Sequence, residues 1–267
     1  MRFLSSRRRH PAAKVLLLVA ALFAVGALYA AVAPTEQSSA EPTTSQQVTE
    51  GKQLFSVNCS SCHGLNGEGT SQGPTLQGVG AAAVDFQVST GRMPLAQPGQ
   101  QAPVKPGEFT DDEIAALAAY VATLGPGPAV PDSSQYSGEG LTDEQIAKGG
   151  ELFRTNCSAC HNFTGQGGAL PGGKHAPSLV GVSNKHLYEA MLTGPQQMPV
   201  FSDDVLTSQD KAQIIAYLNA LHERPNEGGL ALGGLGPVSE GVAIWTIGIG
   251  VLIGFAVWIT ARGARAR

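Results

Sequence analysis

Apolar positions form two uninterrupted runs near the ends of the chain, with a mixed region between them. Residues 15–33 and residues 242–260 are each 19 residues long and carry no charged side chain. A helix of about 20 apolar residues is long enough to cross the hydrocarbon core of a bilayer. The pattern therefore predicts a transmembrane helix at each end. The roughly 200 residues between them are enough for two small domains.

The polar and apolar positions between the two runs predict helices, and the pattern occurs twice. Amphipathic helices are expected to begin after Thr110 and after Thr207, because Thr is a good N-cap and acidic residues follow in the first turn. Residues 51–58 and 149–156 share Gly, Leu, Phe and Asn at matching positions. This internal duplication predicts two similar domains.

The composition then predicts where these parts begin and end. Residues 34–47 are rich in Ser, Thr and Gln, which is typical of a flexible tether. Residues 95–109 are rich in Pro, Gln and Gly, and they are either a docking surface or a passive excursion of the chain. The predicted parts are a tail (1–14), an apolar helix (15–33), a linker (34–47), a first domain (48–125), a linker (126–140), a second domain (141–223), a linker (224–241), an apolar helix (242–260) and a tail (261–267).

Charge is distributed unevenly along the chain. Eight of the 17 Lys and Arg residues lie in the two tails, whereas all 21 Asp and Glu residues lie between Glu36 and Glu240. That middle region has nine basic residues against 21 acidic ones, a net charge of −12. The positive-inside tendency places both termini in the cytoplasm and the domains outside, in a cell membrane. Acidic charge argues against nucleic acid, and it either attracts a basic protein partner or only keeps the domains soluble.

The first apolar run has an alternative interpretation as a secretory signal peptide. An Arg-rich segment precedes it, and the small residues 31–33 fit a cleavage site. The run is longer than the roughly 7–15 residues of a signal core, however, and Pro34 would directly follow the cut. We therefore expect an uncleaved anchor.

All four cysteines lie in two C-x-x-C-H motifs, Cys59–His63 and Cys157–His161. Disulfides, a zinc site and a thioredoxin-like redox pair are alternatives for C-x-x-C alone. The histidine that follows at once makes each motif a signature of c-type haem attachment. Two thiols three residues apart on a helix share one face, so they can bond the two vinyl groups of one porphyrin. The sequence predicts two covalently bound haem c groups, attached to Cys59, Cys62, Cys157 and Cys160.

The axial ligands of each haem iron are predicted from the histidines and methionines. His63 and His161 can each bring an imidazole under the iron as proximal ligand. Met93 and Met198 occupy equivalent places in the two repeats, each followed by Pro, and a soft thioether suits the second position. Met191 falls on an apolar helix face and is expected in the core. His175, His186 and His222 have no counterparts in the first repeat and are expected to be solvated.

These motifs and the duplicated flanks resemble class I cytochrome c domains, and the resemblance covers both halves. It implies an all-α fold in which the first and last helices of each domain cross beside the haem, with Phe55–Tyr120 and Phe153–Tyr217 as aromatic pairs at the crossings. The family's haem histidine donates a hydrogen bond to a proline carbonyl, and Pro74 and Pro177 match that position. The predicted fold class is all-α: two tandem class I cytochrome c domains between an N-terminal and a C-terminal transmembrane helix.

The whole layout resembles the dihaem cytochrome c subunit of the actinobacterial-type cytochrome bcc complex, a menaquinol:cytochrome c reductase. The resemblance implies a multi-pass membrane subunit that relays single electrons from a Rieske iron–sulfur protein to a cytochrome aa3 oxidase, beside a cytochrome b subunit. The chain would then act within an enzyme without a catalytic site of its own. The alternatives are a dihaem subunit of a cbb3-type oxidase or membrane dehydrogenase, and a dihaem peroxidase. Two methionine candidates argue against the peroxidase, which needs an open or His-switched iron.

Overall fold

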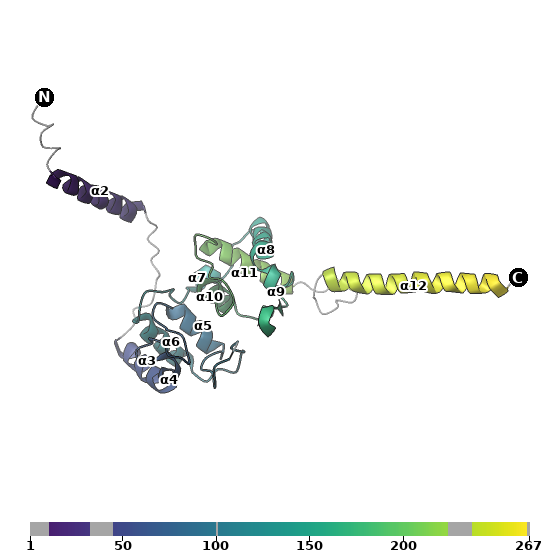
Figure 1. The fold of residues 1–267 in the computed structure, drawn as a ribbon, viewed down its shortest axis with the longest axis horizontal. Helices are drawn as coiled ribbons and strands as arrows, with labels where there is room; N and C mark the ends of the chain where they lie inside the picture. The colour runs from purple at the N-terminus through teal and green to yellow at the C-terminus, as the bar shows by residue number, and fades with distance from the viewer. Residues whose placement is uncertain (1–10, 33–44, 100, 224–236, 266–267) are drawn as a thin grey trace, which may run out of the picture. The chain divides into compact units, whose positions relative to one another are not determined.

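The first domain is built from four helices around one apolar core. The computed structural model describes residues 11–32, 45–99, 101–223 and 237–265. The helices of this domain are α3 (Ser45–Asn58), α4 (Ser60–His63), α5 (Ala81–Ser89) and α6 (Asp111–Ala122) (Figure 1). Phe55 of α3 packs against Leu117, Tyr120 and Val121 of α6, and each of these side chains is at most 5% exposed. The apolar faces of α3 and α6 therefore form the centre of the domain.

The second domain repeats this plan with one addition. The short helix α7 (Ser133–Tyr136) lies in the predicted linker and packs against this domain. The domain's own elements are α8 (Asp143–Asn156), α9 (Ser158–His161), β1 (Gly168–Ala169), η1 (Pro171–Gly173), β2 (His175–Ala176), α10 (Asn184–Thr193) and α11 (Ser208–Glu223). Phe153, Ile214 and Leu218 lie at the centre of its core. The strands β1 and β2 pair antiparallel in the Gly-rich insert that the first domain lacks. The described domains are thus helical apart from this hairpin.

The helix starts follow from capping by threonine. The Thr110 side chain accepts a hydrogen bond from the Glu113 amide, and the Glu113 carboxylate accepts one from the Thr110 amide. Thr207 and Asp210 form the same reciprocal pair at the start of α11. Such caps satisfy amide groups that have no partner within the helix. The two capped helix starts predicted from the sequence are confirmed.

The crossing of the first and last helices depends on one glycine in each domain. A Cβ atom on Gly51 would lie 1.9 Å from the carbonyl oxygen of Ala116, and one on Gly149 would lie 2.0 Å from that of Gln213. The helices can approach this closely because glycine has no side chain. Beside each crossing the predicted aromatic pairs are present, with ring centroids 5.2 Å apart for Phe55–Tyr120 and 5.9 Å apart for Phe153–Tyr217.

The two domains contact each other directly, along α5 and α10. The loop at residues 95–109 takes part, since the Gln101 side chain exchanges two hydrogen bonds with the backbone of His175, and Gln196 donates one to the carbonyl of Ala102. Within the described residues, this loop therefore bridges the two domains, and the interpretation as a passive excursion is wrong. The linker also packs, because its Pro128 carbonyl accepts a hydrogen bond from Ala82.

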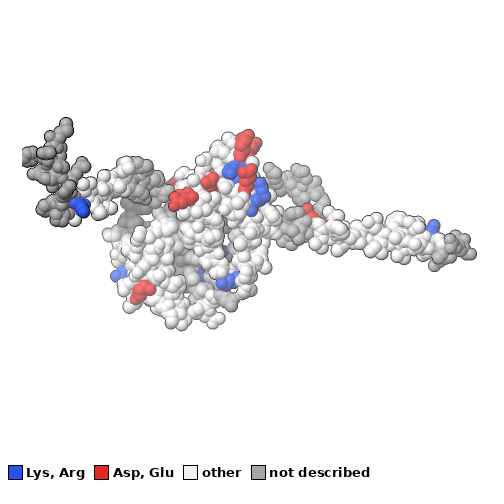
Figure 2. Space-filling model, turned by 45° about the horizontal axis from the view of Figure 1, so that its top comes forward, with Lys and Arg blue, Asp and Glu red and all other residues white. Residues whose placement is uncertain are grey.

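The terminal segments contain two long helices. In α12 (Pro237–Arg265), residues 239–263 have a mean hydropathy of 2.3 and none of them is buried, so by length and composition this helix can cross a membrane. Figure 2 shows an uncharged surface along α12 between its ends. A second helix, α2 (Pro11–Val32), contains most of the first apolar run, and its role as a transmembrane helix stays a prediction. Of the predicted linkers and tails, residues 1–10, 34–44, 224–236 and 266–267 lie outside the described residues.

Candidate functional site

Each C-x-x-C-H motif lies at a break between two helices. α3 ends at Asn58 and α4 begins one residue after Cys59, whose φ of −121° is not helical. The amides of Cys62 and His63 both donate to the Cys59 carbonyl, at 3.2 and 3.0 Å. The corresponding distances to the Cys157 carbonyl are 3.1 and 2.9 Å. The two motifs therefore share one backbone geometry, but the helix is interrupted at the first cysteine, where the sequence predicted a continuous helix face.

The environment of the thiols argues against the alternatives to haem attachment. All four cysteines are free, so neither motif holds a disulfide. Burial, and secondarily the neighbouring Cys62, raises the pKa of the Cys59 thiol to about 11; Cys157 is raised to about 11 in the same way, by burial and then by Cys160. A zinc-binding thiol needs an environment that favours the thiolate. Among the described residues, moreover, neither motif belongs to a cluster of three potential metal ligands.

The two motif histidines are buried and oriented by proline carbonyls. Nδ1 of His63 lies 2.8 Å from the carbonyl oxygen of Pro74, and Nδ1 of His161 lies 3.0 Å from that of Pro177. Because a carbonyl only accepts, Nδ1 must carry the proton, which leaves the lone pair on Nε2 for a metal. Burial lowers the pKa of His161, although the bond to Pro177 opposes the shift, so the ring stays neutral. Both imidazoles thus have the tautomer that an iron ligand needs.

The loop after each motif repeats hydrogen bonds that sequence reasoning missed. The Gly69 amide donates to the His63 carbonyl at 2.7 Å, and the Gly167 amide donates to the His161 carbonyl at 2.9 Å. Gly69 and Gly167 have φ values of +86° and +85°, a region that favours glycine. The signal was present in the sequence, because a G-x-G triplet begins four residues after the histidine in both repeats.

Met93 and Met198 lie after equivalent helices. Met93 follows α5 and its amide donates to the Gln87 carbonyl, whereas Met198 follows α10 and its amide donates to the Pro195 carbonyl. Met93 packs against the same apolar cluster as Cys59, and Met198 against the same cluster as Cys157. Each domain therefore combines a buried motif histidine with a cysteine and a methionine that pack against one core. These residues fit a covalently bound haem in each domain.

Two of the remaining histidines lie in a different environment from the one expected from the sequence. Met191 is 4% exposed in the core of the second domain, as its place on an apolar helix face predicted. His175 is exposed. His222, in contrast, is half-buried with Nε2 3.0 Å from the Thr164 carbonyl, and His186 is half-buried between the domains. The expectation that these two histidines are solvated is therefore wrong.

Four ionisable residues between the domains were also missed. Asp85 lies on α5, and Lys185, His186 and Glu189 lie on α10. Asp85 and Glu189 are 7% and 0% exposed, and Lys185 Nζ lies 2.7 Å from an Asp85 carboxylate oxygen. One feature of the sequence indicated this cluster of ionisable residues, namely an aspartate within the apolar stretch of α5.

Family models match each domain separately. A cytochrome c model matches residues 48–125, and a model of cbb3-type cytochrome c oxidase subunit III matches residues 144–218. The second match covers one domain and follows from the same haem motif. Together they account for both repeats as cytochrome c domains, and the chain binds two haem c groups.

Similar proteins match over nearly the whole chain. A cytochrome bc1 complex cytochrome c subunit of Mycobacterium bovis is 48% identical over 260 residues, which cover 96% of this chain and 92% of that protein. The subunit of the same name from Corynebacterium efficiens is 44% identical, over 95% and 90% of the two chains. The cbb3-type oxidase subunit CcoP of Azospirillum is 29% identical over 48% of this chain and 45% of that protein. Since the first two matches span both cytochrome c domains and the terminal segments at well over 30% identity, the chain belongs to the family of cytochrome c subunits of the cytochrome bc1 complex, which are electron-transfer proteins.

Proposed function

We propose that this chain relays single electrons through its two haem domains from a Rieske iron–sulfur protein to a cytochrome aa3 oxidase, within a menaquinol:cytochrome c reductase. The observation that carries the proposal is the duplicated histidine–proline geometry in one chain whose relatives are bc1 complex subunits. Bound haem iron supplies reversible one-electron transfer. The chain itself contributes attachment, orientation and a fixed distance between two such groups, with no catalytic site of its own.

The residues of each domain have separate roles in this proposal. Cys59 and Cys62 attach the first haem, and Cys157 and Cys160 attach the second. His63 and His161 serve as proximal ligands, held in one tautomer by the carbonyls of Pro74 and Pro177 at 2.8 and 3.0 Å. Met93 and Met198 fill the opposite positions. A filled sixth position keeps small molecules from the iron, which suits a relay and not a peroxidase.

The proposed topology places both haem domains on the extracytoplasmic side. α12 carries Arg262 near its C-terminal end, and Arg7, Arg8 and Arg9 precede the first apolar run. The positive-inside tendency then favours cytoplasmic termini and an uncleaved first anchor. Two anchors would hold the domains at the surface where the partners of the complex lie. The domain boundaries proposed for this layout are residues 48–125 and 141–223.

The alternative complex is a cbb3-type oxidase, which the match of the second domain favours. That likeness covers about half of this chain at 29% identity. It accounts for the haem domain but not for the apolar C-terminal helix, residues 239–263. The bc1-type assignment accounts for both, and we therefore prefer it.

Affinity extraction tests the proposed complex. The chain is given a C-terminal tag, extracted in a mild detergent and analysed by mass spectrometry, with an unrelated tagged membrane protein as control. Enrichment of a cytochrome b and a Rieske protein is the expected result, with or without aa3 oxidase subunits. Enrichment of a cbb3-type oxidase or a dehydrogenase without cytochrome b would refute the proposed complex and leave the haem chemistry intact.

A further inference from the structure

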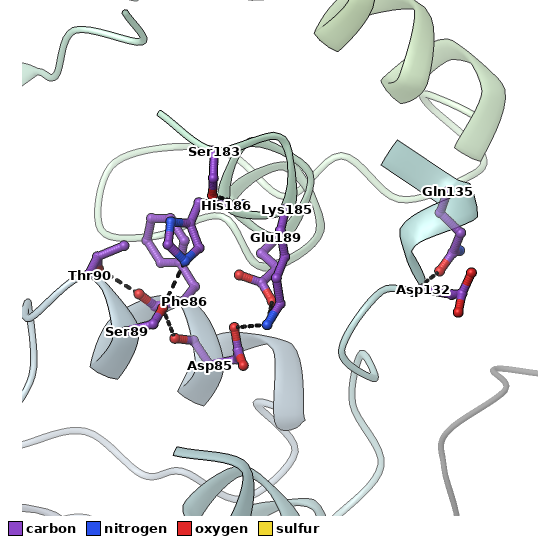
Figure 3. A network of polar contacts seen from close by, with 10 residues as sticks. All are labelled: Asp85, Phe86, Ser89, Thr90, Asp132, Gln135, Ser183, Lys185, His186 and Glu189. Atoms are coloured by element: carbon purple, nitrogen blue, oxygen red, sulfur yellow. Dashed lines mark hydrogen bonds and ion pairs between the residues drawn. The ribbon is translucent and has the colours of Figure 1, made fainter. Parts of the chain in front are cut away.

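Three potential metal ligands from both haem domains converge where α5 meets α10. They are Asp85 of the first domain and His186 and Glu189 of the second, which we call the interdomain triad. One ligand atom from each residue lies within 4.8 Å of the others. Figure 3 shows Asp85 and Glu189 pointing toward one another from the two helices. The triad is separate from both haem motifs, and it joins residues about a hundred positions apart in the chain.

Glu189 has a buried carboxylate without an adequate partner. Its side chain is 0% exposed, and within the described part of the chain neither carboxylate oxygen accepts a hydrogen bond. The nearest ammonium, on Lys185, is 4.0 Å away and is closer to Asp85, at 2.7 Å. A buried carboxylate without a partner is costly, so a cation or a proton must complete this site.

His186 is suited to completing a metal site with the two carboxylates. Burial is the main cause that lowers its pKa, and the nearby Lys185 and Arg92 act in the same direction while Asp85 opposes them. The ring is therefore neutral, as a metal-ligating imidazole must be. His186 and Glu189 are three residues apart on α10, so they project from the same face of the helix. Nε2 of His186 also lies 2.9 Å from the Ser89 hydroxyl, a bond that helps to fix the ring.

We propose that the interdomain triad binds a divalent transition-metal ion such as Zn²⁺, which links the first haem domain to the second. Zn²⁺ accepts both imidazole nitrogen and carboxylate oxygen as ligands, whereas Mg²⁺ and Ca²⁺ prefer oxygen ligands alone. In a tetrahedral site with bonds of about 2.0 Å, ligand atoms lie roughly 3.3 Å apart. The triad must therefore contract by somewhat more than 1 Å from its widest spacing, which side-chain rotation can supply.

Lys185 competes with the metal for the carboxylates. Burial, the largest single cause, lowers its pKa, but the hydrogen bond and charge of Asp85, together with Glu189 and Tyr136, raise the pKa overall, so the ammonium stays charged beside the triad. The side chain is 33% exposed, which leaves it a path to solvent. When a divalent ion binds, Lys185 moves out and any proton held by Glu189 is released. Removing the lysine charge should therefore tighten metal binding.

Titration of Zn²⁺ into the chelator-treated, full-length dihaem protein tests the proposal. The protein is purified in detergent with a tag that contains no histidine, and binding is followed by calorimetry and by metal analysis after desalting. One Zn²⁺ per chain is expected. Changes outside the ligand shell already cost about 10–100-fold in affinity, so Asp85→Asn, Glu189→Gln and His186→Ala should each lower it at least that much. Haem content and visible spectra show whether each variant has folded.

Two further variants separate a metal site from an ion pair. His175→Ala removes an exposed histidine of the second domain and should leave the affinity unchanged. Lys185→Gln should raise the affinity for Zn²⁺, because it removes the competing charge. Wild-type protein that binds no Zn²⁺ would show that a proton shared by Asp85 and Glu189 completes the triad, and would overturn the proposal. Loss of Zn²⁺ affinity in His175→Ala, or equal affinity in Glu189→Gln and the wild type, would also overturn the proposal.

Discussion

Gly149 lies where α8 crosses α11, and replacing it with alanine should destabilise the second domain. The new Cβ would lie 2.0 Å from the Gln213 carbonyl oxygen, whereas real contacts of this kind essentially never fall below 3.0 Å. The helices must therefore part by about 1 Å in a core packed as densely as a crystal. Such overpacking costs typically about 1–3 kcal/mol, and a backbone obstacle cannot rotate away, which favours the upper end. Alanine also favours the helix over glycine by about 1 kcal/mol, which offsets part of this cost.

The net loss of about 2 kcal/mol should lower the unfolding midpoint of this domain by roughly 8–16 °C, because 1 kcal/mol shifts a domain of this size by about 4–8 °C. Thermal unfolding of the full-length dihaem protein, followed by circular dichroism in the haem band, measures it. Gly150→Ala is the matched control, since its Cβ would meet side-chain atoms of Tyr217 and Arg154, at 2.8 and 3.2 Å, and these can move where a backbone carbonyl cannot. Equal midpoints for Gly149→Ala and Gly150→Ala would refute the argument.

Three further outcomes are expected. Met93→Ala or Met198→Ala should keep haem attached but lower the potential of that haem and admit carbon monoxide; unchanged spectra would remove that methionine from the ligand set. Asp203→Asn should lower the free energy of unfolding by about 2 kcal/mol in denaturant titrations, because it leaves the fully buried Lys211 ammonium without its charged partner. Breaking a fully buried pair costs roughly 3–5 kcal/mol, and the one-third exposure of Asp203 reduces that cost. A Lys211→Met variant less stable than Asp203→Asn would contradict this. Burial, then the charge of Asp85, raises the pKa of Glu189 to about 9, so metal-free protein should lose stability as pH rises from about 5 to 9. Glu189→Gln should show less of this loss. Equal pH profiles of the unfolding midpoint in the two proteins would exclude Glu189 as the source.

The duplication explains why much of the haem sites could be predicted from the sequence. Each C-x-x-C-H motif is local, and its proline, methionine and helix crossing recur in the same order in the other half. Two copies of one pattern identify the positions that both domains need. The glycine triplets after the motifs recur in the same way, and they were missed because a glycine in a loop has many explanations. The requirement for glycine at these positions becomes evident only from the positive φ angles and the close approach of the backbone, such as that at Gly69.

The interdomain contact could not be predicted, because it is not duplicated and joins distant residues. Nothing in the local pattern around Asp85 indicates that it faces Lys185, a hundred residues later. Buried ionisable groups contradict the apolar pattern from which cores are predicted, so nothing in the sequence indicated that Glu189 is buried. Lys211, which is fully buried in helix α11, is a second group of this kind. Such groups become interpretable only when their partners are known.

The two domains meet through equivalent elements, which has a consequence for both haems. α5 and α10 occupy the same place in the two repeats, and each ends a few residues before the proposed methionine ligand of its own domain. The charged cluster between them therefore lies one short loop from Met93 on one side and from Met198 on the other. A change of charge at Glu189 should shift the potentials of both haems in the same direction, whereas loss of one methionine should shift one. A redox titration compares Glu189→Gln with the metal-free wild type above about pH 9, where the wild-type carboxyl is ionised. A result in which one potential moves and the other stays would contradict this coupling.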